Sequence, residues 1–198
     1  MDLSPFLTLA SLFKKHGYRL YLTGGSARDY LLKREFIDFD LATDATPSEM
    51  KEFLPDFDYT YARFGNVHAK HIDITTLRVE GEYQDYRHPN VVHFTKKLED
   101  DYLRRDFTIN AIYLDDQLKV YDFTNGVSDL KKKIISFIND PNKRVKEDPL
   151  RILRAERFAK KLGFTIEPNS LKAMQDNRRL LEKLNSNKIK EEIKKHIF

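Results

Sequence analysis

Cysteine is absent from the 198-residue sequence. This absence excludes disulfides and thiolate metal sites, and it suits a reducing cytoplasm. No apolar run approaches the length that crosses a membrane, and the first residues lack a basic leader and a small-residue cleavage site. Internal repeats and low-complexity segments are also missing. We therefore expect a cytoplasmic protein without a membrane partner.

Apolar residues make up 40% of the chain and aromatic residues 12%, which is enough to build a hydrophobic core. The net charge of +4 hides an uneven distribution. Residues 1–130 contain 16 Lys and Arg against 22 Asp and Glu, whereas residues 131–198 contain 19 against 9. An acidic first part suits carboxylate metal sites, and a basic second part suits a polyanion such as RNA. Solvated lysine-rich helices would give the same charge pattern.

The most informative stretch is YLTGGSARDYLLKREFIDFDLAT, residues 21–43. Its pattern predicts a strand, a glycine turn, a helix that begins at Ser26, and a second strand. Gly24 and Gly25 allow a tight turn or the close approach of a ligand to the backbone. The start of a helix offers free N–H groups to an anion, and Arg28 can bind the same anion. We expect a phosphate cradle here.

The second strand of this stretch contains two aspartates. Asp38 and Asp40 are two residues apart and should face the same side, while Ile37, Phe39 and Leu41 face the core. Adjacent carboxylates repel, and Mg²⁺, which binds one or two carboxylates together with substrate phosphates, would offset the repulsion. A phosphate cradle followed by such a pair suggests nucleotidyl transfer by two metal ions. The alternative is a glycine-turn hairpin with solvated aspartates.

A β-hairpin is expected over residues 59–76, with its turn at Gly65. Its second arm alternates between apolar and polar residues, which puts Asp73 on a polar face near the aspartate pair. A third carboxylate can activate the attacking hydroxyl or hold a metal ion. An exposed strand aspartate explains the pattern equally well. His68 and His71 lack a convincing metal-ligand spacing and are interpreted as surface residues.

Two further segments contain candidate nucleotide-binding residues. The string EDDYLRRDFTINA, residues 99–111, predicts a helix with Arg105 suited to a triphosphate and with Asp106 and Asn110 suited to a ribose hydroxyl. A solvated ion-pair network is the alternative. The preceding residues 79–98 are polar and turn-rich, as expected for a surface loop or a mobile lid.

A boundary near residue 139 separates this mixed region from a helical one. Residues 145–162 predict a single helix, and 168–177 and 180–197 predict two more. A stripe along the first helix suits recognition of a nucleobase edge, although i,i+3 ion pairs are the default explanation. The stripe consists of Asp148, Arg151, Arg154 and Arg157.

Taken in order, these segments resemble the class II (bacterial-type) tRNA nucleotidyltransferases, the CCA-adding enzymes. They also resemble the related bacterial poly(A) polymerases of the polymerase-β-like nucleotidyltransferase superfamily. The likeness runs from Tyr21 to Ile197. It implies an α+β fold with a small mixed sheet flanked by helices as the catalytic head, residues 1–139. An all-helical neck for base recognition and RNA contact would follow, residues 140–198.

The resemblance implies catalytic roles for Asp38, Asp40 and Asp73, with two Mg²⁺ ions on the first two. Asp73 stands where the family usually has Glu. Asp148 and Arg151 match the EDxxR motif, which serves as a protein template for C and A. The residues that the resemblance assigns to nucleotide binding are Gly25, Arg28, Arg105, Asp106, Asn110, Asp148, Arg151, Arg154 and Arg157.

The implied reaction is attack by the 3′ hydroxyl of a tRNA on the α-phosphate of CTP or ATP. Residues 78–94 match the family's flexible loop at full length, which favours addition of CCA or of A. An A-adding enzyme or a poly(A) polymerase is the enzymatic alternative. A non-catalytic module that binds nucleotides or RNA is the alternative from another class. Family members continue beyond the neck into body and tail helices that grip the tRNA.

Overall fold

The computed structural model describes residues 1–81 and 92–194, and its contacts divide the chain into two compact units. The first unit contains residues 1–80, 92–105 and 110–123. The second contains residues 106–109 and the chain from residue 124 onward. The chain therefore passes from the first unit to the second more than once. In the described part of the chain, no helix is long and apolar enough to cross a membrane.

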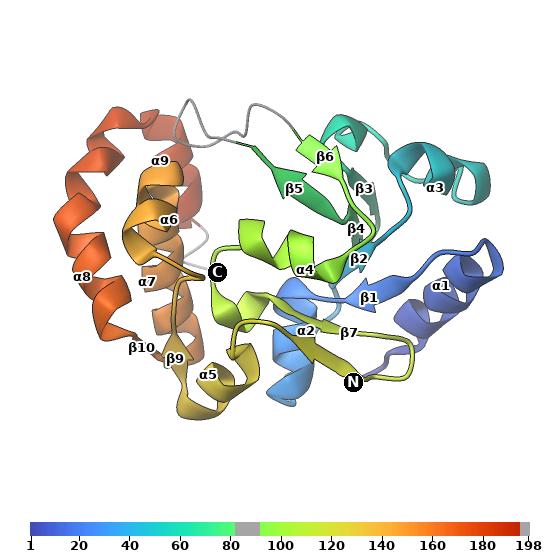
Figure 1. The fold of residues 1–198 in the computed structure, drawn as a ribbon, viewed down its shortest axis with the longest axis horizontal. Coiled ribbons are helices and arrows are strands. Elements are labelled where there is room, and N and C mark those ends of the chain that lie inside the picture. The colour runs from blue at the N-terminus through green and yellow to red at the C-terminus, as the bar shows by residue number, and fades with distance from the viewer. Residues whose placement is uncertain (82–91, 195–198) are drawn as a thin grey trace. The chain divides into compact units, whose positions relative to one another are not determined.

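A six-stranded mixed sheet forms the centre of the first unit (Figure 1). Its strands lie in the order β3-β4-β2-β1-β7-β8. β2 and β4 are parallel, and all other neighbours in the sheet are antiparallel. The expected α+β fold with a small mixed sheet is therefore confirmed. The strands are β1 (Leu20–Leu22), β2 (Phe39–Thr43), β3 (Asn66–Ala69), β4 (Ile72–Thr76), β7 (Ile112–Leu114) and β8 (Val120–Asp122).

Helices flank this sheet. α1 packs against β1, and α2 packs against β2 and β7. A capping box at Thr46 and Glu49 starts α3, because each side chain accepts a hydrogen bond from the other residue's backbone. A separate two-stranded antiparallel pair lies beside α4. These elements are α1 (Ser4–Lys15), α2 (Gly24–Leu31), α3 (Pro47–Phe53), α4 (Leu98–Asp101), β5 (Arg78–Glu80) and β6 (Val92–Phe94), with 3₁₀ turns at Ala62–Phe64 and Tyr102–Arg104.

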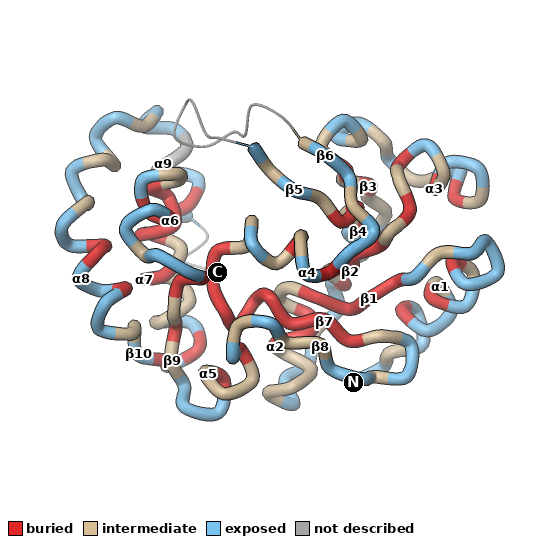
Figure 2. Tube along the Cα trace, viewed as in Figure 1, coloured by how far each residue is buried: buried red, intermediate tan, exposed pale blue. Residues whose placement is uncertain are grey.

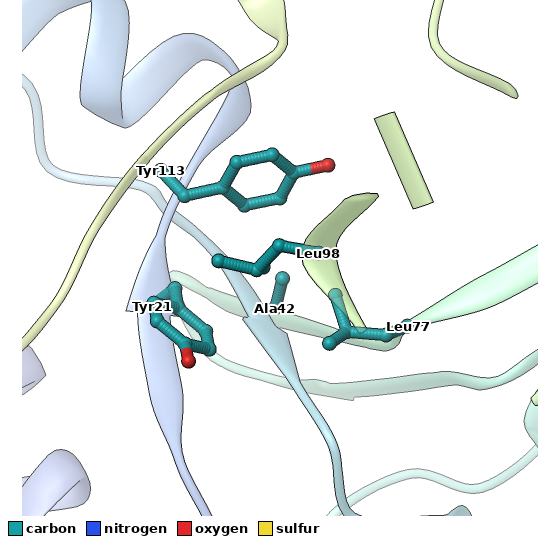
Figure 3. Packing of buried hydrophobic residues seen from close by; sticks show 5 residues of the cluster. All are labelled: Tyr21, Ala42, Leu77, Leu98 and Tyr113. Atoms are coloured by element: carbon teal, nitrogen blue, oxygen red, sulfur yellow. The ribbon is translucent and has the colours of Figure 1, made fainter. Parts of the chain in front are cut away.

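The central strands are buried on both faces, because every residue of β1 and β7 is buried (Figure 2). One core cluster joins these strands to α4. Figure 3 shows its five side chains grouped together, with Tyr113 fully buried. The cluster consists of Tyr21, Ala42, Leu77, Leu98 and Tyr113.

The second unit is mostly helical. Phe107 packs against Phe137 and Phe158, and this anchors residues 106–109 in the unit. β10, which pairs in parallel with β9, corrects the expectation that residues 140–198 are all helical. The elements of this unit are α5 (Gly126–Lys132), β9 (Ile134–Ile135), α6 (Pro141–Glu147), α7 (Leu150–Leu162), β10 (Thr165–Ile166), α8 (Pro168–Asn177), a 3₁₀ turn at Arg178–Lys183, and α9 (Ser186–Lys194). A further 3₁₀ turn covers Thr108–Asn110.

Three predictions about these elements are wrong. The hairpin turn lies between β3 and β4, after Ala69, and residues 62–64 are a 3₁₀ turn rather than a strand. Residues 99–111 are not one helix, because the backbone is extended at Arg105. Residues 145–162 are two helices that meet at Asp148, because a residue before proline is disfavoured in the helical conformation. The expected flexible loop lies mostly outside the described residues.

Candidate functional site

Asp40 is the centre of a group of predicted site residues in the first unit. It lies in β2 directly opposite Asp73 of β4 in the parallel register. Its Oδ2 accepts a hydrogen bond from the Gly25 N–H at 2.7 Å, and its backbone N–H donates to Ser26 Oγ at 2.8 Å. The carboxylate is therefore fixed at the N-terminus of α2, where the helix dipole favours negative charge.

Gly24 and Gly25 begin α2, two residues earlier than predicted. A Cβ on Gly24 would lie 2.9 Å from Asp40 Oδ2, and a Cβ on Gly25 would lie 3.0 Å from the same atom. Gly24 also has a φ of +56°, which other residues adopt only with strain. The two glycines thus allow the Asp40 carboxylate to approach the helix backbone. The sequence suggested that a ligand could approach this backbone closely. In the structure, the Asp40 side chain makes such an approach.

Burial raises the pKa of Asp40 above its ordinary value. The hydrogen bond from Gly25 opposes this shift, and the nearby Asp73 carboxylate adds to it. Arg105 and Arg28 also oppose the shift, but the net direction remains upward. An ionised Asp40 is therefore incompletely compensated by the protein, and a cation at this position would stabilise it.

Asp38 lies just before β2 rather than inside it, and its side chain is 73% exposed. The Nδ1 atom of His71 is 2.7 Å from Asp38 Oδ1. On the neighbouring strand, the Nδ1 atom of His68 is 2.5 Å from Asp73 Oδ1. Ile37 is 69% exposed, so the prediction that it faces the core is wrong.

The interpretation of the two histidines as plain surface residues missed these contacts. The pairing of β3 with β4 shows how the contact of His68 could have been predicted from the sequence. His68 and Asp73 are cross-strand partners in the antiparallel pair of β3 and β4. Placing the hairpin turn correctly would have put both side chains on one face of the sheet.

Arg28 and Asn110 are brought together within the same unit. Arg28 is buried, and its Nη1 donates to Asn110 Oδ1 at 3.0 Å. Its Nε and Nη2 both donate to the Asp29 carboxylate at 2.9 Å. The guanidinium is thus fixed in orientation beside the start of α2, 3.4 Å from where a Gly25 Cβ would lie.

Arg105 belongs to a buried network rather than to an exposed helix face. Its Nε donates to Asp101 Oδ2 at 3.1 Å and to the Tyr113 hydroxyl oxygen at 2.9 Å. The Tyr113 hydroxyl donates to Asp101 at 2.7 Å, and Arg104 donates to the same carboxylate at 2.8 Å. Asp101 was not among the predicted site residues. Its position, three residues before one arginine and four before the next, is nevertheless a recognisable ion-pair spacing.

The charges of this network support one another. Burial acts to raise the pKa of Asp101, but Arg104 and Arg105 outweigh it and hold the pKa well below its usual range. Burial raises the pKa of Tyr113, so this hydroxyl stays protonated and donates to Asp101. The network fixes the position of Arg105.

The remaining predicted residues lie in the second unit. Asp106 is buried and forms an ion pair with Arg154, and its Oδ1 accepts the Phe107 N–H at 2.7 Å. Arg157 forms an ion pair with Glu192 at 3.0 Å. Two of the predicted nucleotide-binding residues, Asp106 and Arg154, are therefore in direct contact.

Arg151 and Asp148 lie at the junction of α6 and α7. The buried Arg151 donates through Nη1 to the carbonyl of Arg144 at 2.7 Å and to Glu147 at 2.8 Å. Asp148 accepts a hydrogen bond from the Leu150 N–H at 3.1 Å. The expected stripe along one helix is therefore incorrect for Asp148, which precedes α7 instead of lying on it.

The donors near Asp40 fit a hard divalent cation through their chemistry. Asp38, Asp40 and Asp73 supply carboxylate oxygens, and a cation would favour the ionised form of Asp40, whose pKa is raised by burial. Within residues 1–81 and 92–194, no three acidic or histidine side chains converge as a complete metal-binding group. Mg²⁺ is usually bound by one or two carboxylates with substrate phosphates, so an all-protein cage is not required.

Comparison with known proteins adds independent findings. Residues 20–136 match the family described as the poly A polymerase head domain. The chain is 44% identical over 183 residues to a CCA-adding enzyme of Lactobacillus helveticus, covering 90% of this chain and 46% of the relative.

Two solved structures resemble the chain along its length. The crystal structure of Bacillus stearothermophilus CCA-adding enzyme in complex with CTP has a TM-score of 0.89 at 32% identity, covering 99% of this chain and 49% of that one. The Thermotoga maritima CCA-adding enzyme complexed with tRNA has a TM-score of 0.77 at 25% identity, covering 100% and 48%. The chain spans about half the length of these relatives.

Proposed function

Because the chain belongs to the poly A polymerase head domain family, we propose that it is an RNA nucleotidyltransferase of the CCA-adding type. It adds C and A from CTP and ATP to the 3′ end of a tRNA. The observation that carries the proposal is the pairing of Asp40 with Asp73 beside the glycine start of α2. That arrangement joins carboxylates, which suit divalent cations, to a helix N-terminus, which favours a phosphate.

In the proposed reaction the RNA 3′ oxygen forms a bond to the α-phosphorus, and the bond from that phosphorus to the pyrophosphate oxygen breaks. Asp38 and Asp40 would hold the divalent cations. Bound Mg²⁺ would lower the pKa of the attacking hydroxyl and neutralise charge on the leaving pyrophosphate. Asp73, directly across from Asp40, takes the proton that the 3′ hydroxyl loses.

The arginines and glycines of the first unit orient the triphosphate in this proposal. Gly24 and Gly25 place the α2 N-terminus next to Asp40, and Arg28 lies close to the same turn. Arg105, fixed by Asp101 and Tyr113, offers its guanidinium to the phosphates. Asn110, bound to Arg28, contacts the ribose. These residues act by preorganised electrostatics, because their charges and donors are held in place before the reaction begins.

The second unit selects the base. Asp148 and Arg151 present acceptor and donor groups to the Watson–Crick edge of C or A. The Arg144 carbonyl and Glu147 fix the Arg151 guanidinium in place, which limits the entropy lost on binding. Asp106, Arg154 and Arg157 complete the nucleotide contacts of this unit. We assign residues 1–139 to the catalytic head and 140–198 to the neck, in a cytoplasmic protein.

The test is extension of a tRNA that lacks its 3′ CCA, with Mg²⁺ and with CTP alone, ATP alone, or both. We expect two C residues from CTP alone, and one A and a stop when ATP is added. Addition of A without regard to the end of the tRNA would identify an A-adding enzyme or a poly(A) polymerase. Nucleotide binding without incorporation would identify a non-catalytic binding module.

A further inference from the structure

The two histidines of the β3–β4 hairpin each contact one of the proposed catalytic carboxylates. His71 Nδ1 lies 2.7 Å from Asp38 Oδ1, and His68 Nδ1 lies 2.5 Å from Asp73 Oδ1. An ionised carboxylate only accepts hydrogen bonds, so in each contact the ring nitrogen is the donor. The same arrangement thus occurs twice within the first unit.

His71 is the more informative of the two because its backbone is also engaged. It has a φ of +61°, a left-handed conformation that a residue with a Cβ adopts at a cost of about 1 kcal/mol. In that conformation its carbonyl accepts the N–H of Phe39 at 2.8 Å. Phe39 directly follows Asp38, so backbone and ring of His71 both act on the start of β2.

Asp38 depends on such support. It precedes the first residue of β2, and its side chain is 73% exposed. Its backbone carbonyl accepts a hydrogen bond from Ser26 Oγ at 2.9 Å, which fixes the main chain but not the carboxylate. The His71 ring contact is what restricts the rotation of the Asp38 side chain.

We propose that His71 is a positioning residue, which orients the Asp38 carboxylate for a divalent cation by donating from Nδ1. This inference rests on the proposed function, in which Asp38 binds the cation. Carboxylates that bind metals commonly accept a hydrogen bond from a neighbouring residue that does not itself contact the metal. Loss of that residue weakens metal affinity about 10- to 100-fold. The role requires a directed N–H group, which a neutral imidazole supplies.

The experiment measures Mn²⁺ binding by the electron paramagnetic resonance signal of the free ion. RNA is omitted, and a CTP analogue with a non-cleavable α–β bridge is present, so turnover does not enter. The variants are His71→Gly, His71→Asn and Asp38→Asn. Glycine removes the ring and relieves the positive φ, so the fold is retained. Asparagine tolerates the left-handed conformation and keeps an N–H donor.

We expect His71→Gly to weaken Mn²⁺ binding about 10-fold and His71→Asn to stay within about 3-fold of the wild type. With Mg²⁺ and RNA, His71→Gly should need more Mg²⁺ for half-maximal incorporation and reach a near-normal rate at saturation. A purely structural role would not raise the Mg²⁺ requirement while leaving the rate at saturating Mg²⁺ near normal. His93→Asn, which changes an exposed imidazole on β6, controls for the loss of any histidine and should leave Mn²⁺ binding unchanged.

Three results would overturn the inference. If His71→Gly binds Mn²⁺ like the wild type while Asp38→Asn does not, the metal site stands and His71 has no part in it. If His71→Asn is as weak as His71→Gly, the N–H donor is not the cause. If Asp38→Asn also binds normally, the metal assignment of the proposed function fails, and the role of His71 fails with it.

Discussion

Asp40 and Asp73 are direct partners across the parallel pair of β2 and β4, although they are far apart in the sequence. Because partners in a parallel ladder lie side by side, their side chains lie on the same face of the sheet. The Asp73 charge contributes to the raised pKa of Asp40, so the two groups interact electrostatically as well as spatially. This repulsion is maintained by the fold, which is expected where a cation is to be bound.

The glycines at the start of α2 give a matched pair of variants. Gly24→Ala and Gly17→Ala both place a Cβ at a positive φ, which costs about 1 kcal/mol of stability. Only the Gly24 Cβ would collide with the Asp40 carboxylate, since nothing lies within 4 Å of a Cβ on Gly17. We therefore expect Gly24→Ala to lose more unfolding free energy than Gly17→Ala, and nucleotide incorporation to fall in Gly24→Ala alone. Equal activity in both variants would show that the position of Asp40 is unimportant.

The raised pKa of Asp40 predicts that this residue, which the proposed function needs in its ionised form, lowers the stability of the fold. The folded state holds the proton on this carboxyl more tightly than the unfolded state, so an ionised Asp40 destabilises the fold above its native pKa. Asp40→Asn should therefore be more stable than the wild type at pH 7.5 with a chelator present. The advantage should shrink as the pH falls through the native pKa toward the unfolded value of about 3.9. Urea unfolding at several pH values measures the difference in stability between the variant and the wild type. An Asp40→Asn variant that is less stable than the wild type at pH 7.5 would contradict this explanation.

Asp101 predicts the opposite behaviour. Its pKa is held low by Arg104 and Arg105, so it adds stability above the unfolded pKa that is lost as the pH falls through the native pKa. Asp101→Asn should cost about 3–5 kcal/mol near neutral pH, because it removes the buried carboxylate charge that Arg104 and Arg105 both contact. The cost should shrink in acid. Glu99→Gln, at an exposed position of the same helix, should stay within about 0.5 kcal/mol. Equal effects of the two changes would argue against the buried network.

Glu147 tests how the second unit prepares its nucleotide contacts. Its carboxylate accepts from Arg144 at 2.6 Å and from Arg151 at 2.8 Å. Glu147→Gln should cost about 1.5–3 kcal/mol and reduce the discrimination between CTP and ATP, since Arg151 loses a charged partner. Glu156→Gln, which affects an exposed pair with Arg178, is the control and should preserve both properties. Competition between labelled CTP and ATP measures the selectivity. Unchanged selectivity in Glu147→Gln would remove Arg151 from base recognition.

Local patterns predicted much of this structure. The alternation along β4 correctly placed Ile74 and Thr76 inside and Asp73 outside. The bounds of α8, with proline at its first turn, were also predicted correctly. Such signals succeed where neighbouring residues alone decide the conformation. The roles of Asp38, Asp40 and Asp73 in metal binding stay a prediction, because they depend on a ligand as well as on the fold.

The errors arise where tertiary contacts override local preference. Residues 99–111 have helical spacing, yet Asp101 is drawn inward by Arg104, Arg105 and Tyr113, and the backbone becomes extended. Residues 106–109 pair with 136–138 instead, through the hydrogen bond from Ile138 N–H to the Asp106 carbonyl. No window of neighbouring residues contains that information. The break at Pro149 is different, because the rule for residues before proline predicts it from neighbouring residues alone.

The most direct test of the account is single-turnover incorporation of CMP into a tRNA that lacks its CCA end. Wild type and Asp40→Asn are compared at saturating CTP, and binding of CTP and of tRNA is measured separately for both. We predict that the variant loses about 1,000-fold or more in rate, since several kcal/mol of metal-dependent stabilisation are removed, while both binding affinities stay within about 3-fold. A variant that incorporates CMP at the wild-type rate would contradict the assignment of Asp40 to the catalytic centre.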